Sequence, residues 1–481
     1  METSKPLSAF VVVVTIFVVS LLIWYGGDHP AHVPPGNFIA KPYLQLGSGG
    51  GLAIVWQVSG EDTGDTWTLE VRRRENSSWE KVESIHDRVL HVDSIEPYHL
   101  LSADVTNLGI TAFDYRVLKN EQPVFSAHAN PRVEAPDKYH FAVMGDCGAD
   151  TIAQRKIAYQ LLKAKPNFIL ITGDSVYDGG RASEYLHHFF PIYNNESADP
   201  TKGAPLIRST LMSAVPGNHD IANSSIFDTR NMAIFPDSLA YFYEWLQPLN
   251  GPDKAGGKNT PVLLHNPQRQ ATFLTAAGVN YPAMANFYFD LGNARFIMLD
   301  ANPYMDWSDP AWRKWLEDTL TAASSKQWRF VVYHQTAFNS DTTHFSEQRM
   351  RLISDILEKH KVRIVFAGHV HNYQRTYPLH FQPGQMDSKG LVPGIFEIAS
   401  KGTAPHEGEI VYITTGGGGG HLSGGTISQT PSGWQPFTDR FIANTHSFTL
   451  CEVDGGNLSA TQISEDGTVL DRFSVANRGS D

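Results

Sequence analysis

The sequence has few cysteines, no excess of basic residues and no Walker motif, and each absence excludes a class of protein. The 481 residues include only two cysteines, Cys147 and Cys451, which cannot make a disulfide framework. The formal net charge of −12 argues against nucleic acid or an anionic membrane surface as a partner. The glycine run at 416–420 is followed by His421 and not by Lys and Ser or Thr, so the Walker phosphate-loop pattern fails there.

A long uncharged apolar run lies near the N-terminus, at residues 7–25. It exceeds the ~7–15 residues of a signal-peptide core and is long enough to span a bilayer. No convincing cleavage site follows it, and Trp24 and Tyr25 suit a membrane interface. We therefore expect residues 1–25 to be an uncleaved signal anchor or, alternatively, a cleaved signal peptide. The rest of the chain would then be exported, either membrane-anchored facing outside the cytosol or secreted or periplasmic.

Two different segments follow this run. Residues 26–38 are rich in Pro, His and Gly and are typical of a linker. Residues 39–131 contain short runs of strand composition at 52–58, 66–71 and 113–118, separated by turn signals. Regular short strands of this kind predict a small all-β sandwich domain, in which Leu108-Gly109 and Tyr115 are typical of a tyrosine corner.

The region 138–481 contains apolar runs that each end in polar side chains, usually beside a glycine. These runs are residues 139–144 before Asp146, 167–172 before Asp174 and Tyr177, 213–215 before Asn218, His219 and Asp220, 328–333 before His334, and 362–367 before His369 and His371. Helical patterns at 152–164 and 347–359 alternate with the runs. Open α/β sheets bind ligands at the carboxyl ends of their strands, so the pattern predicts one site built from these side chains.

The chemistry of these side chains points to metal ions. Asp, Asn, His and Tyr are oxygen and nitrogen donors, which suit Zn, Mn or Fe better than a soft metal such as Cu(I). There are too many donors for one closed tetrahedral site. A two-metal centre, with ions ~3.5–4 Å apart and a bridging carboxylate, uses them all. Such a centre activates a water molecule and holds a phosphoryl group for in-line displacement.

The motifs carry a resemblance to a known family. Gly-Asp-x-Gly, Gly-Asp-x-x-Tyr, Gly-Asn-His-Asp, Val-x-x-His and Gly-His-x-His occur in this order, and the set resembles the metal motifs of the purple acid phosphatases, within the calcineurin-like metallophosphoesterases. The resemblance implies an α/β metallophosphoesterase sandwich of two mixed sheets flanked by helices for residues 138–481. For residues 39–131 it implies a fibronectin type III-like domain.

The resemblance also implies a role for each donor. Asp146, Tyr177 and His371 would hold a ferric ion. Asn218, His334 and His369 would hold a divalent ion, Fe, Zn or Mn, and Asp174 would bridge the two ions. A phenolate is a hard anionic donor that stabilises the ferric state, which agrees with a tyrosine in this set.

Three more residues are candidates for work on the substrate. His219 follows Asn218, and in the family this histidine contacts the phosphate or the leaving group; Asp220 could orient it. His344 lies where the plant enzymes have a histidine pair, but here the pair is Thr343-His344. We expect His344 to protonate the leaving oxygen.

The sequence therefore predicts an acid phosphatase that hydrolyses small phosphomonoesters at a dinuclear centre, where a metal-bound hydroxide attacks phosphorus in line. A phosphodiesterase on the same metal core is an alternative. A non-catalytic phosphate- or metal-binding surface protein is another. The long insertion at 221–285 is expected to shape the substrate entrance. The oligomeric state stays open.

Overall fold

The structure is a computed structural model, and it describes residues 38–60, 64–73, 77–108, 112–130, 135–221, 235–252, 259–261, 267–399 and 408–477. The expected signal anchor lies outside these residues, as do nearly all of the expected linker and part of the insertion at 221–285. Among the described residues, no helix is both long and apolar enough to cross a membrane.

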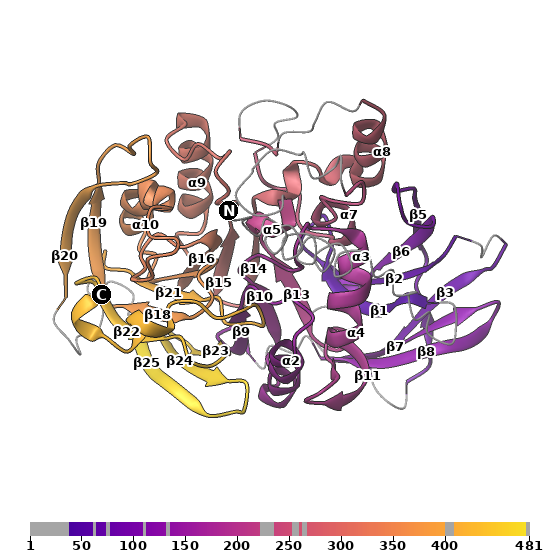
Figure 1. Ribbon diagram of the computed structural model, residues 1–481. Coiled ribbons are helices and arrows are strands. Elements are labelled where there is room, and N and C mark those ends of the chain that lie inside the picture. The colour runs from indigo at the N-terminus through magenta and orange to yellow at the C-terminus, as the bar shows by residue number, and fades with distance from the viewer. Residues whose placement is uncertain are drawn as a thin grey trace, which may run out of the picture. The chain divides into compact units, whose positions relative to one another are not determined.

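The first strands form two antiparallel sheets that share an apolar core (Figure 1). One sheet has the order β1 (Phe38–Leu46), β2 (Leu52–Ser59), β6 (Tyr98–Asp104), β5 (His86–Leu90), and the other has the order β4 (Glu80–Lys81), β3 (Trp67–Arg72), β7 (Phe113–Lys119), β8 (Gln122–Ala129). Alternate side chains of β3 and β7, such as Leu69 and Val117, are buried against Ile54 and Trp56 of β2. An all-β region therefore occupies the N-terminal part of the described chain, as the sequence predicted.

Hydrogen bonds join this all-β region to the rest of the chain. The backbone N–H of Leu44 donates to the carbonyl of Ile207 at 3.0 Å. The buried hydroxyl of Tyr115 donates to the carbonyl of Arg208 at 2.9 Å, and it lies 3.3 Å from that of Pro42. Among the described residues this hydroxyl bonds across the interface, and the turn at 109–111 of the expected tyrosine corner lies outside them.

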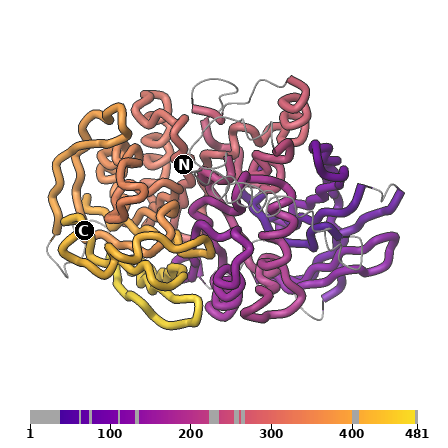
Figure 2. Tube along the Cα trace, in the orientation of Figure 1, coloured from indigo at the N-terminus to yellow at the C-terminus, as the bar shows by residue number. Residues whose placement is uncertain are grey.

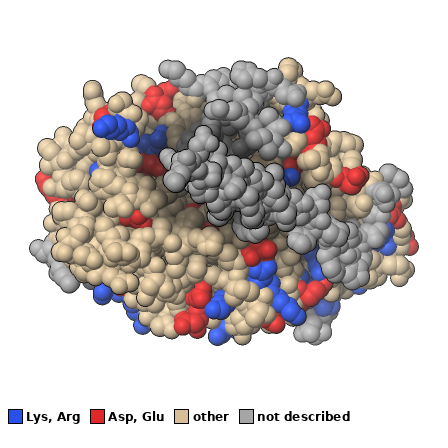
Figure 3. All heavy atoms as spheres, viewed as in Figure 1, with Lys and Arg blue, Asp and Glu red and all other residues tan. Residues whose placement is uncertain are grey.

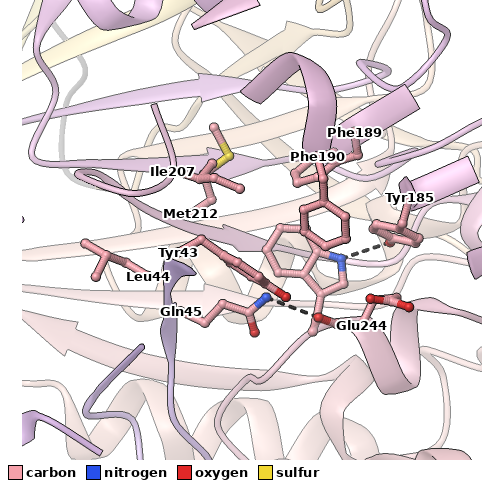
Figure 4. Close-up of a pocket in the computed structure, with 10 residues that line it drawn as sticks. Tyr43, Leu44, Gln45, Tyr185, Phe189, Phe190, Ile207, Met212 and Glu244 are labelled. Atoms are coloured by element: carbon pink, nitrogen blue, oxygen red, sulfur yellow. Dashed lines mark hydrogen bonds between the residues drawn. The ribbon is translucent and has the colours of Figure 1, made fainter. Parts of the chain in front are cut away.

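A carboxylate is buried at the same interface. Glu244, in α7 (Tyr241–Glu244), accepts hydrogen bonds from Gln57 of β2 and Tyr98 of β6. Figure 4 shows Gln45 of β1 beside it, donating to the Glu244 carbonyl at 3.2 Å. Burial raises the pKa of the Glu244 carboxyl to about 7.

Two mixed sheets make up the remainder of the fold (Figures 1 and 2). The six-stranded sheet has the order β13 (Leu211–Ala214), β10 (Phe168–Ile171), β9 (Lys138–Met144), β23 (Ser447–Asp454), β24 (Asn457–Ser464), β25 (Val469–Ala476). The seven-stranded sheet has the order β14 (Phe287–Leu291), β15 (Ala294–Met298), β16 (Trp328–Gln335), β17 (Ile364–Gly368), β21 (Val411–Thr415), β18 (Tyr373–Thr376), β22 (Thr438–Ile442). Strands β9, β10 and β13 are parallel to one another, as are β15, β16, β17 and β21.

Shorter elements complete the described chain. They are the strand pairs β11 (Asn194–Asp199) with β12 (Gly203–Pro205) and β19 (Leu379–Pro383) with β20 (Gly394–Ile398), the helices α2 (Ile152–Ala164), α3 (Ala182–Glu184), α4 (Phe190–Tyr193), α5 (Asn218–Ile221), α8 (Pro267–Ala277), α9 (Pro310–Ala322), α10 (Ser354–Lys359) and α11 (Gly425–Ser428), the 3-10 turns η1 (Thr106–Leu108), η3 (Gly278–Asn280), η4 (Ala283–Ala285), η5 (Arg349–Ile353) and η6 (Pro431–Gly433), and the π-helical turn η2 (Tyr185–Phe189). The helix predicted at 152–164 is α2. The one predicted at 347–359 is η5 followed by α10.

Aromatic rings fill the space between the two mixed sheets. The ring centroid of Phe141 in β9 lies 5.3 Å from that of Phe168, 5.3 Å from Phe296 and 5.2 Å from Phe330. Burying a phenyl side chain contributes about 1.5–3 kcal/mol, so this cluster is a large part of what holds the sheets together. Because strand side chains alternate, the neighbouring residues Ala142 and Met144 face the opposite side.

Helices cover the outer face of each mixed sheet. Ile157 and Leu161 of α2 pack against Ala142 and Met144 in one cluster. Leu316 of α9 packs in another cluster, with the outward side chains of β16. Thr151 begins α2 by accepting a hydrogen bond from the N–H of Gln154 at 3.1 Å. The layers are thus helix, sheet, sheet, helix, which is the predicted architecture of two mixed sheets flanked by helices.

Candidate metal centre

Three residues at strand ends have a backbone conformation that residues other than glycine rarely adopt. The angle φ is +59° at Asp146 after β9, +50° at Asp174 after β10, and +68° at His369 after β17. Such a conformation costs on the order of 1–3 kcal/mol and is concentrated at functional sites. This edge of the two sheets is therefore the candidate site.

Asp146, Tyr177 and His371 form one group of donors. The Tyr177 hydroxyl lies 3.2 Å from Asp146 Oδ1 and 3.0 Å from His371 Nε2, and 3.3 Å separates these two atoms from each other. His371 Nδ1 lies 2.7 Å from the carbonyl oxygen of His421, to which it donates. A neutral imidazole that donates from Nδ1 has its lone pair on Nε2. That lone pair points at the phenol and the carboxylate.

Asn218, His334 and His369 form a second group, with Asp174 beside them. His334 Nε2 lies 2.9 Å from Asn218 Oδ1, 3.2 Å from His369 Nδ1 and 3.4 Å from Asp174 Oδ2. His334 Nδ1 donates to the carbonyl of Thr172 at 2.8 Å. The sheet backbone therefore fixes which nitrogen of His334 faces the site.

The facing nitrogens of His334 and His369 lie close enough to bind one cation, either a shared proton or a metal ion. Nε2 of His369 lies 3.0 Å from a carboxylate oxygen of Glu347, and a proton on this nitrogen would leave the lone pair on Nδ1. The 3.2 Å contact between the two nitrogens is then bridged by the proton of His334 or, when that proton is replaced, by a metal ion. One ligand atom each of Asp146, Asp174 and His334 lie within 4.8 Å of one another, which connects the two groups. The donor set fits a dinuclear metal centre in which a carboxylate is shared.

Two glycines allow the loops to approach this closely. A Cβ atom on Gly217 would lie 2.1 Å from Asp174 Oδ1 and 2.3 Å from the Asp174 backbone nitrogen. A Cβ atom on Gly173, where φ is +100°, would lie 2.5 Å from His334 Nδ1. The Gly-Asp and Gly-Asn pairs of the motifs are thus explained by the space around the next ligand.

The buried carboxylate and imidazole hold charge of opposite sign. Burial lowers the pKa of His334, but the Asp174 carboxylate raises it more, to about 10. Burial raises the pKa of Asp174, but His334 and two other histidines lower it well below the usual range. The pair is therefore stable with a proton on the histidine, and a metal ion would take the place of that proton.

His219 lies at the rim of this centre. Its backbone N–H donates to Asp174 Oδ1 at 2.8 Å, and its ring packs on Tyr177 at a centroid distance of 4.4 Å. Nδ1 of His219 lies 2.9 Å from the carbonyl oxygen of Asp178, to which it donates. The lone pair on Nε2 is then available to a ligand.

Asp220 has partners other than the one expected from the sequence. Its carboxylate is buried and accepts hydrogen bonds from the backbone N–H of Gly217 at 2.8 Å and of Ser175 at 3.1 Å. Among the contacts of the described residues, it makes no hydrogen bond with the His219 ring. Asp220 therefore joins the loop that carries Asp174 to the loop that carries Asn218, and the carbonyl of Asp178 orients His219 instead.

His344 lies against the second group of donors. Its ring centroid is 3.9 Å from that of His369. Its Nδ1 lies 2.8 Å from Oε1 of Glu347, whose other oxygen contacts His369. The sequence reasoning missed Glu347. The signal that could have found it is its spacing of three residues from His344, which brings side chains together in a helical turn.

The glycine run at 416–420 packs against the first group. The N–H of Gly418 donates to the carbonyl of Gly145 at 3.0 Å, and the N–H of Gly420 donates to that of Asp146 at 2.8 Å. His421 approaches the centre through its backbone carbonyl, and its side chain is exposed. The run is therefore a close-packed backbone support for Asp146 and His371.

The described surface agrees with the acidic composition. In Figure 3, Lys and Arg are interspersed with Asp and Glu, and no continuous basic area covers the described part of the face shown. Both cysteines are free and buried.

Comparison with known proteins identifies the domain. The family model for the calcineurin-like phosphoesterases matches residues 139–373, the segment that carries all of these donors. The chain carries a calcineurin-like phosphoesterase domain. Its curated homologues include purple acid phosphatases, so the resemblance seen in the motifs is confirmed.

Three relatives illustrate the range of the match. A phosphoenolpyruvate phosphatase of Allium cepa is 25% identical over 64% of this chain and 55% of its own length. A nucleotide pyrophosphatase/phosphodiesterase of Hordeum vulgare is 29% identical over 40% of this chain and 52% of its own length. An Fe(3+)-Zn(2+) purple acid phosphatase of Arabidopsis thaliana is 25% identical over 60% of this chain and 52% of its own length. The chain spans about half the length of these curated relatives.

A solved structure shows the same fold. The purple acid phosphatase PPD1 of yellow lupin (Lupinus luteus) superposes with a TM-score of 0.61 at 14% identity, over 90% of this chain and 74% of its own. The metallophosphoesterase fold with an N-terminal all-β region is therefore shown.

Proposed function

We propose that this protein hydrolyses small phosphomonoesters at a dinuclear metal centre. The observation that carries the proposal is that His334 Nε2 lies within 3.4 Å of donor atoms of Asn218, His369 and Asp174, because oxygen and nitrogen donors gathered in this way fit a metal ion. The same strand edge holds two further histidines, His219 and His344, that can contact a substrate.

In this proposal each donor group holds one ion. Asp146, Tyr177 and His371 would hold Fe(III), because a phenolate and a carboxylate favour a hard trivalent ion. The second ion, Fe(II), Zn or Mn, would be held by Asn218, His334 and His369, with Asp174 shared. The name of the Arabidopsis relative, which pairs Fe(3+) with Zn(2+), supports this assignment. When bound, such ions lower the pKa of a water molecule and neutralise phosphoryl charge.

The protein's own side chains would then bind and orient the ester. His219 presents Nε2 at the rim, since its Nδ1 donates to Asp178. His344 is held by Glu347 and would give a proton to the leaving oxygen. Asp220 would act as a positioning residue, because it ties the Asp174 and Asn218 loops together.

The test is hydrolysis of an aryl phosphomonoester and of the matching diester from acidic to alkaline pH. We expect a monoester preference with an acidic optimum. We expect Asp174→Asn to lower kcat/KM by more than about 100-fold, since residues behind metal ligands already account for ~10–100-fold. Asp290→Asn is the matched control, because Asp290 pairs with Arg295 away from the site. No hydrolysis of either ester by protein with both metals bound would refute the proposal and favour the non-catalytic binding protein.

A phosphodiesterase is the second candidate. The barley relative is named as a nucleotide pyrophosphatase/phosphodiesterase, which supports this alternative. A diester preference in the same assay would select it, and the insertion at 221–285 would become the region to examine.

We also propose the remaining expectations for the N-terminal part of the chain. Residues 1–25 would export the protein as a signal anchor or a signal peptide, residues 26–38 would be a linker, and residues 39–131 would be a fibronectin type III-like domain before the catalytic domain at 138–481. Two four-stranded antiparallel sheets with a shared core support the third of these. Detection of the intact N-terminus in a membrane fraction would separate an anchor from a cleaved peptide.

A further inference from the structure

Arg349 is a largely buried arginine with no hydrogen bond or ion pair to any residue of the described chain. Its Nε is buried and unpartnered. Arg351, two residues later in the same turn, is different: its Nε donates to the carbonyl of Ala337 at 2.7 Å, and its guanidinium lies 4.7 Å from the ring centroid of Phe338. Arg351 is therefore a packing residue, and Arg349 is not explained by packing.

Arg349 lies beside the second group of donors. It is two residues after Glu347, which contacts both His344 and His369. Burial lowers the pKa of Arg349, and the charges of Glu347 and Asp300 raise it in part.

Asp300 connects this position to the loop that carries Asn218. The Asp300 carboxylate accepts a hydrogen bond at 2.9 Å from the side chain of Asn302. The same amide of Asn302 lies 3.3 Å from the carbonyl of Gly217, the residue before Asn218. The two carboxylates that act on Arg349 thus belong to the His369 side and to the Asn218 side of the same donor group.

Both carboxylates already have other partners. Each oxygen of Glu347 contacts a histidine, and the oxygens of Asp300 accept from Tyr304 and Asn302. A buried Nε without a partner is costly, and an anion that binds the guanidinium in a two-pronged geometry offsets that cost. With a net charge of −12, the protein needs such a local cation to hold an anionic ligand.

We propose that Arg349 is a specificity-determining residue that binds a second anionic group of the substrate, such as a carboxylate close to the phosphoryl group. The inference rests on the proposed phosphomonoester hydrolysis. It narrows the substrate class to phosphomonoesters that carry another negative charge within a few atoms of phosphorus.

The test compares matched substrates. 2-Phosphoglycolate has a carboxylate where ethyl phosphate has a methyl group. In 1,2-ethanediol bisphosphate a second phosphate supplies the negative charge. A hydrogen-bonded charge pair is worth about 1.5–3 kcal/mol, so we expect Arg349→Met to lower kcat/KM for 2-phosphoglycolate by about 10–150-fold. For ethyl phosphate we expect a change below about 3-fold. The bisphosphate shows whether Arg349 also binds a phosphate group in place of the carboxylate. Arg116→Met, which removes a pair with Glu70 in the all-β region, is the control.

A binding measurement keeps this test separate from catalysis. Calorimetric titration of the metal-loaded protein with phosphonoacetate and with ethylphosphonate needs no turnover. We expect the wild type to prefer phosphonoacetate, Arg349→Met to lose the preference and Arg349→Lys to keep part of it. Equal losses for both ligands, or no preference in the wild type, would overturn the inference. If neither ester is hydrolysed but the Arg349-dependent preference remains, the proposed hydrolysis fails and the anion site stands.

Discussion

One carboxylate oxygen of Glu347 lies 3.0 Å from Nε2 of His369, whereas Nδ1 of the same ring lies 3.2 Å from His334 Nε2. A carboxylate in this position orients the ring and makes Nδ1 a better donor. The other oxygen holds His344, so one residue positions both a candidate ligand and a candidate proton donor.

Removing this carboxylate should therefore weaken metal binding first. We expect Glu347→Gln to lower the affinity for the second ion by about 10–100-fold, because the amide can offer its NH2 group to a ring that needs an acceptor. The measurement is metal content after dialysis against graded chelator. Glu397→Gln, in the exposed strand β20, is the control. If the metal content is unchanged but turnover falls, Glu347 acts only by positioning His344.

The sequence predicted the donors but not the residues behind them. The sequence could indicate Asp146, Asp174 and His334 because each follows an apolar strand, and parallel strands bring their carboxyl ends to one edge of the sheet. The helical pattern at 347–359 included Glu347, but the residue lies in an irregular loop before a 3-10 turn, so that pattern does not show which way its side chain faces.

Hydrogen bonds to the backbone could not be predicted from the sequence, for a different physical reason. The partners of Asp220 are the N–H groups of Gly217 and Ser175, and that of His219 is the carbonyl of Asp178. Every residue except proline offers such groups, so no side-chain motif marks them. The partner of Tyr115, a carbonyl 93 residues away, could be found only from the packing of the two regions.

Gly217 should be essential because of the space around it. A Cβ atom there would lie 2.1 Å from Asp174 Oδ1 and would displace the carboxylate that we propose to be shared by both ions. We expect Gly217→Ala to lose more than about 100-fold in kcat/KM, as for a direct change to the centre. Gly425→Ala is the matched control, because no atom lies within 4 Å of its added Cβ. Full activity in Gly217→Ala would contradict the close approach of these loops.

Tyr177 should give an iron-loaded protein its colour. Burial raises the pKa of this phenol well above 10, and the nearby carboxylates raise it further, so only a strongly charged ion would hold it as phenolate. We expect visible absorption from a phenolate–Fe(III) pair and its loss in Tyr177→Phe. Tyr333→Phe is the control, since the Tyr333 hydroxyl is buried without a hydrogen bond. Absorption that survives in Tyr177→Phe would exclude Tyr177 as the ligand.

Glu244 should make stability depend on pH at the interface with the all-β region. Its folded pKa of about 7 lies above the ordinary value of 4.5, so the folded state binds the proton more tightly. The associated stability is complete below pH 4.5 and is lost as pH rises through 7, by about 3 kcal/mol. We expect the unfolding midpoint of the wild type to fall across this range relative to that of Glu244→Gln. Parallel curves for the two proteins would show that Glu244 stays charged when folded.

His344 should matter most when the leaving group needs a proton. An alkyl oxide is a poor leaving group and depends on a general acid, whereas 4-nitrophenolate leaves without one. We expect His344→Ala to lower kcat for ethyl phosphate by about 100-fold or more, and for 4-nitrophenyl phosphate by much less. Because the His344 ring lies 3.9 Å from that of His369, metal content must be measured in the same sample. His140→Ala is a control with an imidazole far from the site, at the start of β9. Equal losses for both esters, with both ions retained, would mean that His344 binds the phosphoryl group and that another group donates the proton, with His219 the next residue to change.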